Sequence, residues 1–424
     1  MREMKDSGVD WIGEVPASWD MLRIYQLAFP VKNKNEGMKE NNLLSLSYGN
    51  IVQKDINKVD GLVPASYEGY NIIEPGDIVL RFTDLQNDQR SLRTGLCSFN
   101  GIITSAYLAI RPRHELVSSE YLHYVLHFVD TLKVFYNMGG GMRQSLDWHG
   151  VSHMFLPIPP QAEQCRIVAY LDERCAAIDE DVAKRREVIE KLKEYKKSLI
   201  AHAVTKGLDP NVEMRDSGVE WIGEVPAGWE IHYPKALFFM RNERMKPGDT
   251  QLTASQEYGV IPQSEFQERE GRRVVQVILN PDILKHVEVG DFVMHMRSFQ
   301  GGLELAYQSG CVSSAYVMLR RRTDKVRESY FKYLFKSSAY IDALRSTSNL
   351  IRDGQALRFA NFIQVYLPLP SIDEQDKIAV YLDERCAAID EAVSRQEKLI
   401  EKLGEYRKSI IHHAVTGKID CTEA

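Results

Sequence analysis

The stretch QAEQCRIVAYLDERCAAIDEDVAKRREVIEKLKEYKKSLIAHA occupies residues 161–203 and contains neither Gly nor Pro. Apolar residues recur in it at steps of three, four and seven, which is the pattern of a long amphipathic helix with one heptad-like seam. At a rise of about 1.5 Å per residue, this helix extends for roughly 60 Å. A single helix of that length cannot leave its apolar stripe in water, so the pattern predicts a partner helix.

The partner is predicted in the same chain, because residues 374–414 read EQDKIAVYLDERCAAIDEAVSRQEKLIEKLGEYRKSIIHHA. The block YLDERCAAID begins at Tyr170 and again at Tyr381, and the apolar seam repeats in phase. We expect the two helices to pack antiparallel as an intramolecular coiled coil. The predicted seam consists of Ile167, Leu171, Ile178, Val182, Ile189, Leu192, Leu199, Ile378, Leu382, Ile389, Val393, Ile400, Leu403 and Ile410.

Polar residues interrupt the seam at matched places. Arg185 corresponds to Gln396 in the second copy, and Lys196 corresponds to Arg407. Such residues can fix the register of a helix pair. Alternatively, they lie just beside the seam and extend their charged ends into water.

A second duplication marks where each repeat begins. MKDSGVDWIGEVPASW at residues 4–19 returns as MRDSGVEWIGEVPAGW at 214–229, and its Trp, Ile and Val residues suit a structural clasp. Between arm and helix lie two mixed regions, 20–155 and 230–366, that share short motifs. The matched motifs are two strand patterns, 75–82 with 289–296 and 105–113 with 314–322, and one amphipathic helix, 120–127 with 329–336.

The sequence therefore predicts a mixed α+β protein with a pseudo-two-fold internal repeat. Two α/β domains are expected on either side of two long antiparallel coiled-coil helices. The predicted segments are an arm with the first domain (1–155), the first spacer helix (156–207), a second arm with the second domain (208–366), and the second spacer helix with a tail (367–424).

The composition is that of a soluble globular protein. The chain has 424 residues, 44% of them apolar and 26% charged, with a formal net charge of −6. It has neither a run of eighteen apolar residues nor the apolar core of a signal peptide, so a cytoplasmic protein without a membrane span is expected. The six cysteines form no C-x-x-C, and reduced thiols are expected.

Motifs that would indicate catalysis are absent from the sequence. We find no phosphate-binding G-x-x-x-x-G-K-[ST], no G-x-G-x-x-G, no H-E-x-x-H and no Cys/His cluster at zinc spacing. The nearest approach to an amino-methyltransferase motif, Asn280-Pro281-Asp282-Ile283, lacks the second proline and the aromatic residue. We therefore expect no catalytic residues, no metal and no cofactor bound by this chain.

A binding role fits two domains that share a plan and differ in their loops. Residues 20–155 carry 13 basic and 14 acidic side chains, and residues 230–366 carry 19 and 15. Arg, Lys and Gln near turns can contact phosphates and base edges, although any one of them can equally be a solvated surface charge. The candidates are Lys32, Lys34, Arg81, Arg90, Arg93, Arg143, Gln144, Arg241, Arg244, Lys246, Arg272, Arg273, Arg297, Arg352 and Gln355.

The chain resembles the DNA-specificity subunits of type I restriction–modification systems along essentially its full length. The resemblance is carried by the arm WIGEVPxxW at Trp11 and Trp221 and by the segments LPIPPQAEQCRIVAYLDERCAAID (156–179) and LPLPSIDEQDKIAVYLDERCAAID (367–390). It implies two target-recognition domains, each reading half of a bipartite double-stranded DNA site, with helices that set the gap. It also implies partners: two methyltransferase subunits that carry S-adenosylmethionine and methylate adenine, and motor–nuclease subunits that cut DNA.

Two other interpretations stay open from the sequence. One is a two-headed, non-enzymatic scaffold that binds proteins, which the near-neutral first domain favours slightly. The other is a stand-alone regulator that binds two DNA sites without partners. Co-purification with a methyltransferase chain would exclude the scaffold, and tight DNA binding by the chain alone would favour the regulator.

Overall fold

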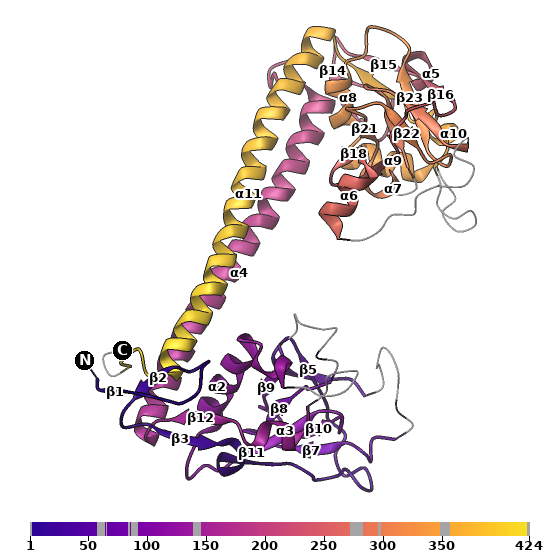
Figure 1. Cartoon of the computed structure of the whole chain (residues 1–424). Coiled ribbons are helices and arrows are strands. Elements are labelled where there is room, and N and C mark those ends of the chain that lie inside the picture. The colour runs from indigo at the N-terminus through magenta and orange to yellow at the C-terminus, as the bar shows by residue number, and fades with distance from the viewer. Residues whose placement is uncertain are drawn as a thin grey trace. The chain divides into compact units, whose positions relative to one another are not determined.

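The computed structural model describes residues 2–56, 64, 66–83, 85, 92–138, 146–271, 283–295, 298–347 and 357–421. The chain forms two compact units (Figure 1). Unit 1 comprises Met1–Arg185 together with Glu397–Ala424, and unit 2 comprises Arg186–Gln396. Each unit thus combines one mixed domain with a segment of each long helix. Within the described residues, none of the helices combines the length and apolar character that crossing a membrane requires.

Unit 1 contains the first arm, the first mixed domain and parts of both long helices. Its strands are β1 (Met4–Asp6), β2 (Glu14–Pro16), β3 (Asp20–Arg23), β4 (Ala28–Pro30), β5 (Leu43–Ser47), β6 (Asn50–Lys54), β7 (Asn71–Ile73), β8 (Ile78–Leu80), β9 (Thr94–Leu96), β10 (Gly101–Ile103), β11 (Leu108–Pro112) and β12 (Phe155–Ile158). Its helices are α1 (Ile24–Leu27), α2 (Ser119–Thr131), the 3₁₀ turn η1 (Val134–Asn137) and α3 (Trp148–Ser152), with the beginning of α4 (Gln161–Lys206) and the end of α11 (Ile372–Val415).

Two four-stranded sheets form the first mixed domain, in the orders β6-β5-β10-β7 and β4-β11-β8-β9. All neighbouring strands are antiparallel except β5 and β10, which pair in parallel. β12 pairs with β3 and brings the chain from the domain to the start of α4. The amphipathic pattern of residues 120–127 is realised in α2, whose buried face belongs to the main apolar core of unit 1.

The first arm is a β-hairpin, β1 with β2, rather than an isolated turn. Ile12, Val15 and Trp19 are buried, and the indole Nε1 of Trp19 donates to Oε2 of Glu163 in α4 at 3.2 Å. The end of α11 reaches the same place. A Cβ on Gly417 would lie only 2.3 Å from Cγ of Pro16, so the backbone after α11 packs directly on the arm. This hairpin is the clasp that the sequence predicts.

Unit 2 repeats the plan with different loops. Its strands are β13 (Met214–Asp216), β14 (Glu224–Pro226), β15 (Glu230–His232), β16 (Phe238–Arg241), β17 (Leu252–Ser255), β18 (Gly259–Pro262), β19 (Lys285–Val287), β20 (Phe292–Met294), β21 (Glu304–Leu305), β22 (Gly310–Val312), β23 (Val317–Arg321) and β24 (Leu367–Leu369). Its short helices are α5 (Pro234–Leu237), α6 (Gln263–Glu270), α7 (Ser298–Gly301), α8 (Glu328–Leu334), α9 (Ser338–Ser346) and α10 (Phe359–Phe362), and it holds the remaining parts of α4 and α11.

The second mixed domain keeps one four-stranded antiparallel sheet, β16-β23-β20-β21, which matches β4-β11-β8-β9 of the first. Its other strands pair two by two, as β17-β18, β19-β22 and β15-β24. Aromatic rings dominate the core: Phe238 lies 5.1 Å from Phe331 and 5.9 Å from Phe292, measured between ring centroids. The domains thus share a scaffold and differ at the periphery, as the matched motifs indicate.

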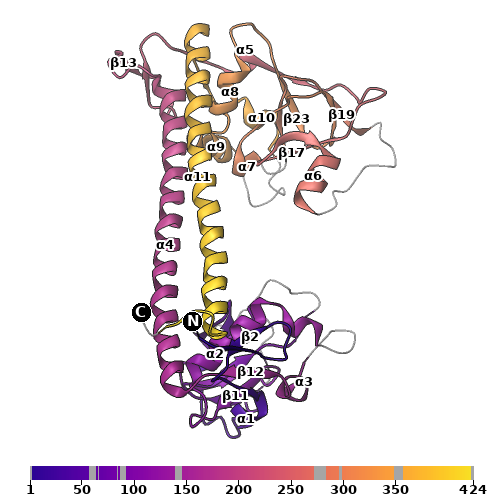
Figure 2. The same ribbon diagram turned by 60° about the vertical axis from the view of Figure 1, so that its left-hand side comes forward.

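The long helices run antiparallel within each unit, and Figures 1 and 2 show the two segments side by side. In unit 1 Asp179 of α4 binds Arg407 of α11, and Arg2 joins Glu163 near the start of α4 to Asp420, just after the end of α11. Residue numbers therefore rise along α4 in the direction in which they fall along α11. The predicted mixed fold with two long helices is confirmed. Predicted at 161–203 and 374–414, the helices extend over Gln161–Lys206 and Ile372–Val415.

Candidate nucleic-acid interface and helix pair

The helix seam packs most tightly near the mixed domains. Eight of its residues are buried: Ile167, Leu171, Ile178, Ile189, Ile378, Leu382, Ile389 and Ile410. The other six are only half-buried: Val182, Leu192, Leu199, Val393, Ile400 and Leu403. The buried members belong largely to the two domain cores, because Ile167 and Ile410 share one cluster and Ile378 and Leu382 share the other. The helix pair is therefore an extension of each domain's core.

The charged interruptions of the seam bind across the helix pair. Lys196 is half-buried, and its Nζ lies 2.7 Å from both carboxylate oxygens of Asp390. Arg407 makes the equivalent bond to Asp179 in unit 1. The sequence left open whether these residues fix the register of the helix pair or lie beside the seam with their charged ends in water. Each alternative holds in part, because Lys196 and Arg407 lie beside the seam and also join the two helices. Arg185 instead pairs with Asp181 of its own helix, with Nε 3.1 Å from Oδ1.

A buried glutamine at the start of each long helix joins it to the adjacent domain. In unit 1 the Oε1 of Gln164 accepts the backbone N–H of Ser118, just before α2, at 2.9 Å. In unit 2 the Oε1 of Gln375 accepts the N–H of Arg327, just before α8, at 2.9 Å. Both side chains are at most 1% exposed. The start of each long helix is therefore fixed to the start of the domain helix that it contacts.

The candidate DNA-contacting residues fall into three groups. Eight lie outside the described residues: Arg90, Arg143, Gln144, Arg272, Arg273, Arg297, Arg352 and Gln355. Five are exposed or half-exposed: Lys32, Lys34, Arg81, Arg244 and Lys246. The remaining two, Arg93 and Arg241, are buried. The first two groups stay predictions.

Arg93 has a structural role, and its assignment to DNA was wrong. The residue is 0% exposed. Its Nη1 donates to the carbonyl oxygen of Thr83 at 2.7 Å and its Nε donates to the hydroxyl of Tyr136 at 3.2 Å. Its backbone N–H donates to the carboxylate of Asp130. The guanidinium thus links the loop between β8 and β9 to η1, and the backbone N–H of Arg93 links it to α2. A guanidinium held in this way cannot reach a phosphate.

Arg241 is likewise corrected to a structural role. It is 8% exposed and lies within 3.0 Å of carboxylate oxygens on Glu243, Glu288 and Asp291. Lys246, although exposed, also pairs with Glu288, with Nζ 3.3 Å from Oε1. The excess of basic residues counted in the second domain is thus partly neutralised by internal pairs, which weakens net charge as an argument for binding.

Two residues that the sequence analysis did not single out support the same turn in each domain. The guanidinium of Arg111 pairs in bidentate fashion with Asp77, with Nε to Oδ1 at 2.7 Å and Nη2 to Oδ2 at 2.9 Å. In unit 2 Arg320 reaches Asp291 at 3.2 Å and Glu288 at 3.0 Å. The aspartates are at most 1% exposed. The sequence feature that could have pointed to these Asp–Arg pairs is the Gly-Asp turn, which is repeated at 76–77 and 290–291.

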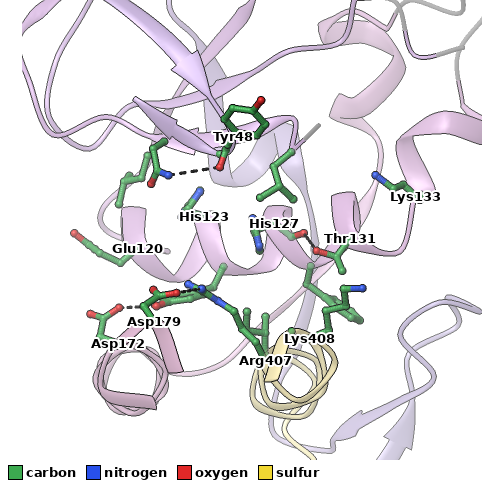
Figure 3. A pocket seen from close by; sticks show the side chains of 18 residues that line it. Tyr48, Glu120, His123, His127, Thr131, Lys133, Asp172, Asp179, Arg407 and Lys408 are labelled. Carbon is green, nitrogen blue, oxygen red and sulfur yellow. Dashed lines mark hydrogen bonds and ion pairs between the residues drawn. The ribbon is translucent and has the colours of Figure 1, made fainter. Parts of the chain in front are cut away.

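Unit 1 holds a cleft of about 900 Å³ between α2, the β5–β6 turn and the two helix segments (Figure 3). Polar lining residues include His123, His127, Asp172 and Arg407. Burial lowers the pKa of His123 to about 3 and that of His127 to about 4, so both rings are neutral at pH 7. Figure 3 shows both histidines on one stretch of α2 above the two long-helix segments, which are seen end-on.

The comparisons with known proteins agree on one class. No family model matches the chain. It is 22% identical over 428 aligned positions to a putative type I restriction enzyme MjaX specificity subunit of Methanocaldococcus jannaschii, covering 96% of this chain and 95% of that protein. The chain resembles type I specificity subunits along its whole length.

Solved structures show the same fold. A chain described in connection with complex assembly and conformational transition of the type I R-M system aligns with a TM-score of 0.67 at 17% identity, covering 96% of this chain and 99% of that one. The HsdS subunit from Thermoanaerobacter tengcongensis aligns with a TM-score of 0.50 at 17% identity, covering 96% and 98%. The fold of a type I specificity subunit therefore accounts for both mixed domains and both long helices.

Among the residues that the structure describes, one cluster has the composition of a metal site. Glu243, His286 and Glu288 place potential ligand atoms within 4.8 Å of one another. Cations already engage this cluster, because Arg241 binds both glutamates and Arg320 lies 3.0 Å from Glu288. His286 also lies 2.8 Å from the carboxylate of Asp249. We assign this cluster to the ion-pair network that supports β16, β19 and β23.

Proposed function

We propose that this chain is the DNA-specificity subunit of a type I restriction–modification complex. Each mixed domain reads one half of a bipartite double-stranded DNA site. The long helices set the gap between the half-sites and dock two methyltransferase chains, which bring S-adenosylmethionine. The chain itself performs recognition without catalysis, and motor–nuclease subunits complete the complex.

The observation that carries this proposal is the duplicated architecture in a chain that resembles specificity subunits end to end. Both units use the same glutamine at the helix start, the same Gly-Asp turn held by an arginine, and the same cross-helix ion pair. The parts that differ are loops and small strands, which suits two readers of different base sequences. A scaffold for proteins would not by itself explain the resemblance to DNA-specificity subunits.

The direct test is to co-express the chain with a type I methyltransferase chain from the same genome and to map methylated adenines throughout the host genome. We expect one motif with two defined halves and a constant gap. Replacing residues 230–366 with the corresponding domain of another specificity subunit should change one half of the motif and leave the other unchanged. Methylation that needs no defined motif, or that is unaffected by the exchange, contradicts the proposal.

A second test addresses the predicted contacts of Arg272 and Arg273, which lie outside the described residues. Replacing both with Ala should weaken binding of the assembled complex to its site and reduce the slope of log K against log salt by about two. The matched control replaces Lys235 and Lys325, two exposed lysines of the same domain, with Ala. Unchanged affinity of the Arg272/Arg273 variant at two salt concentrations would refute this pair of contacts.

A further inference from the structure

The cleft of unit 1 differs from the equivalent region of unit 2 in a consistent way. The two helices that face the long-helix segments are related residue by residue, so that His123 and His127 of α2 correspond to Lys332 and Lys336 of α8. Gly404, which lines the cleft, corresponds to Lys193 of α4. Three lysines of unit 2 are therefore replaced in unit 1 by shorter side chains.

In unit 2 the lysines of α8 form ion pairs with acidic side chains of the same chain. Lys332 Nζ lies 2.6 Å from Oδ1 of Asp383, which also accepts the hydroxyl of Tyr333 at 2.6 Å. Lys336 Nζ lies 2.6 Å from Oε2 of Glu304. The carboxylate of Asp383, on the face of α11 toward the domain, thus has a cation from its own chain.

In unit 1 the equivalent carboxylate belongs to Asp172 and has no such partner. It accepts the hydroxyl of Tyr124 at 2.6 Å, as Asp383 accepts that of Tyr333. Among the described residues, neither Asp172 nor the neighbouring Glu120 forms an ion pair. The cations that line the cleft are already engaged: Arg407 binds Asp179, Lys408 lies 2.8 Å from Glu405, and Lys133 lies over the ring of Tyr136.

The walls of the cleft suit the stem of a long side chain. Leu92, Leu96, Phe128 and Ile411 supply apolar surface beside the acidic groups. Lys and Arg bury their methylene stems against such surface while their charged ends pair with acids. A nucleic-acid phosphate is a poor occupant, because the carboxylates of Asp172 and Glu120 line the cleft and would repel it.

We propose that the cleft of unit 1 receives a lysine or arginine side chain of the methyltransferase partner, whose cationic end pairs with Asp172. Lys332 fills the equivalent place in unit 2 from within the chain. Two copies of the same partner would therefore meet different surfaces on the two units. Unit 1 offers the cleft with the carboxylate of Asp172, here called the acidic socket, and in unit 2 Lys332 already fills the equivalent place. This inference rests on the proposed function, because it names the same methyltransferase chain as the occupant.

The test measures the two binding steps of the co-purified methyltransferase on the full chain by calorimetry and native mass spectrometry. We expect Asp172→Asn to weaken one step about tenfold, and to do so less at high salt. His123→Lys should give a similar loss, since the new ammonium can pair with Asp172 as Lys332 pairs with Asp383. The matched control, Asp383→Asn, should leave both steps within twofold. Lys332→His, which removes the internal cation from Asp383, should weaken neither step and should strengthen the step at unit 2.

Thermal unfolding of each variant shows whether a loss of binding reflects misfolding, and the two independent cleft variants guard against one that fails to fold. Two unchanged steps in Asp172→Asn and His123→Lys overturn the socket while leaving the proposed function intact. Equal losses in Asp172→Asn and Asp383→Asn also overturn it, because they mean that both units bind alike. If the unmodified chain binds no methyltransferase, the proposed function fails and the socket fails with it.

Discussion

Arg407 on α11 binds Asp179 on α4, and the repeat makes the same bond with the helices exchanged. Lys196 on α4 binds Asp390 on α11, and both partners lie 211 positions from their counterparts. The basic residue and the acidic residue thus come from opposite helices in the two units. Each pair specifies one alignment of its two helix segments, because a shift of either segment by a turn separates the charges.

These cross-helix pairs should contribute modestly to stability and mainly to alignment. The carboxylates of Asp179 and Asp390 are 60% and 61% exposed, so water screens both pairs. Double-mutant cycles with Asp179→Ala and Arg407→Ala, and with Lys196→Ala and Asp390→Ala, should each give a coupling of about 0.5 kcal/mol in urea denaturation. A coupling above about 2 kcal/mol in either cycle would show that the pair is a principal stabilising contact.

The buried aspartates of the Gly-Asp turns should matter far more. Replacing Asp77 with Ala leaves the guanidinium of Arg111 without its bidentate partner. Asp291→Ala removes a buried carboxylate that both Arg241 and Arg320 contact, although each keeps its pair with Glu288. We expect each change to lower the free energy of unfolding of its unit by about 3 kcal/mol. Asp324→Ala is the control, because Asp324 is fully exposed and 3.7 Å from Arg321, and it should cost less than about 0.5 kcal/mol.

Replacing each of two glycines near the end of α11 with alanine should change the free energy of unfolding in opposite directions. Gly417 has φ +71° and its backbone packs on Pro16, so Gly417→Ala introduces both strain and a clash and should destabilise unit 1 by roughly 1–3 kcal/mol. Gly404 lies inside the helix, and a Cβ added there would meet open space. Gly404→Ala should stabilise the chain by up to about 1 kcal/mol. Chemical denaturation of both variants measures the two changes in the free energy of unfolding. Changes in the same direction would contradict the prediction.

Periodicity and repetition predicted much of the fold because they report local geometry. The seam, the two antiparallel helices and the matched strands followed from the spacing of apolar residues in two copies. Repetition within one chain also showed which patterns recur, such as the Gly-Asp turn before β8 and β20. The arm was predicted as a clasp but its two strands were not, because they have only three residues each and carry no alternating apolar pattern.

The candidate DNA contacts show where sequence reasoning stops. Arg93 and Lys32 are both basic residues near predicted turns, yet Arg93 is 0% exposed and Lys32 is exposed. Their difference depends on the carbonyl of Thr83 and the hydroxyl of Tyr136, which folding brings to Arg93 from elsewhere in the chain. Which basic residue meets a tertiary partner depends on long-range contacts, and a single sequence does not record them.

The two units should respond to pH in opposite directions. In unit 2 burial raises the pKa of Glu304 to about 7, from an ordinary 4.5, despite the neighbouring Lys336. Because its pKa is raised, the folded state binds the proton of Glu304 more tightly than the unfolded state does. The contribution of Glu304 to the free energy of unfolding is therefore fully present below about pH 4.5 and is lost as pH rises through 7. In unit 1 the pKa of His123 is lowered to about 3, so the unfolded state takes up a proton more readily than the folded state does. The contribution of His123 to the free energy of unfolding is therefore present above pH 6.5 and is lost as pH falls.

Pulse proteolysis with peptide mapping at pH 5 and pH 8 can follow each unit separately in the full chain. We expect unit 2 to need less urea for cleavage at pH 8 than at pH 5, and Glu304→Gln to reduce this difference, because a neutral amide cannot titrate. Asp324→Ala serves as a matched control, since its carboxylate is fully exposed. Should the pH dependence of unit 2 be the same in the Glu304→Gln variant, the raised pKa of Glu304 is not its cause.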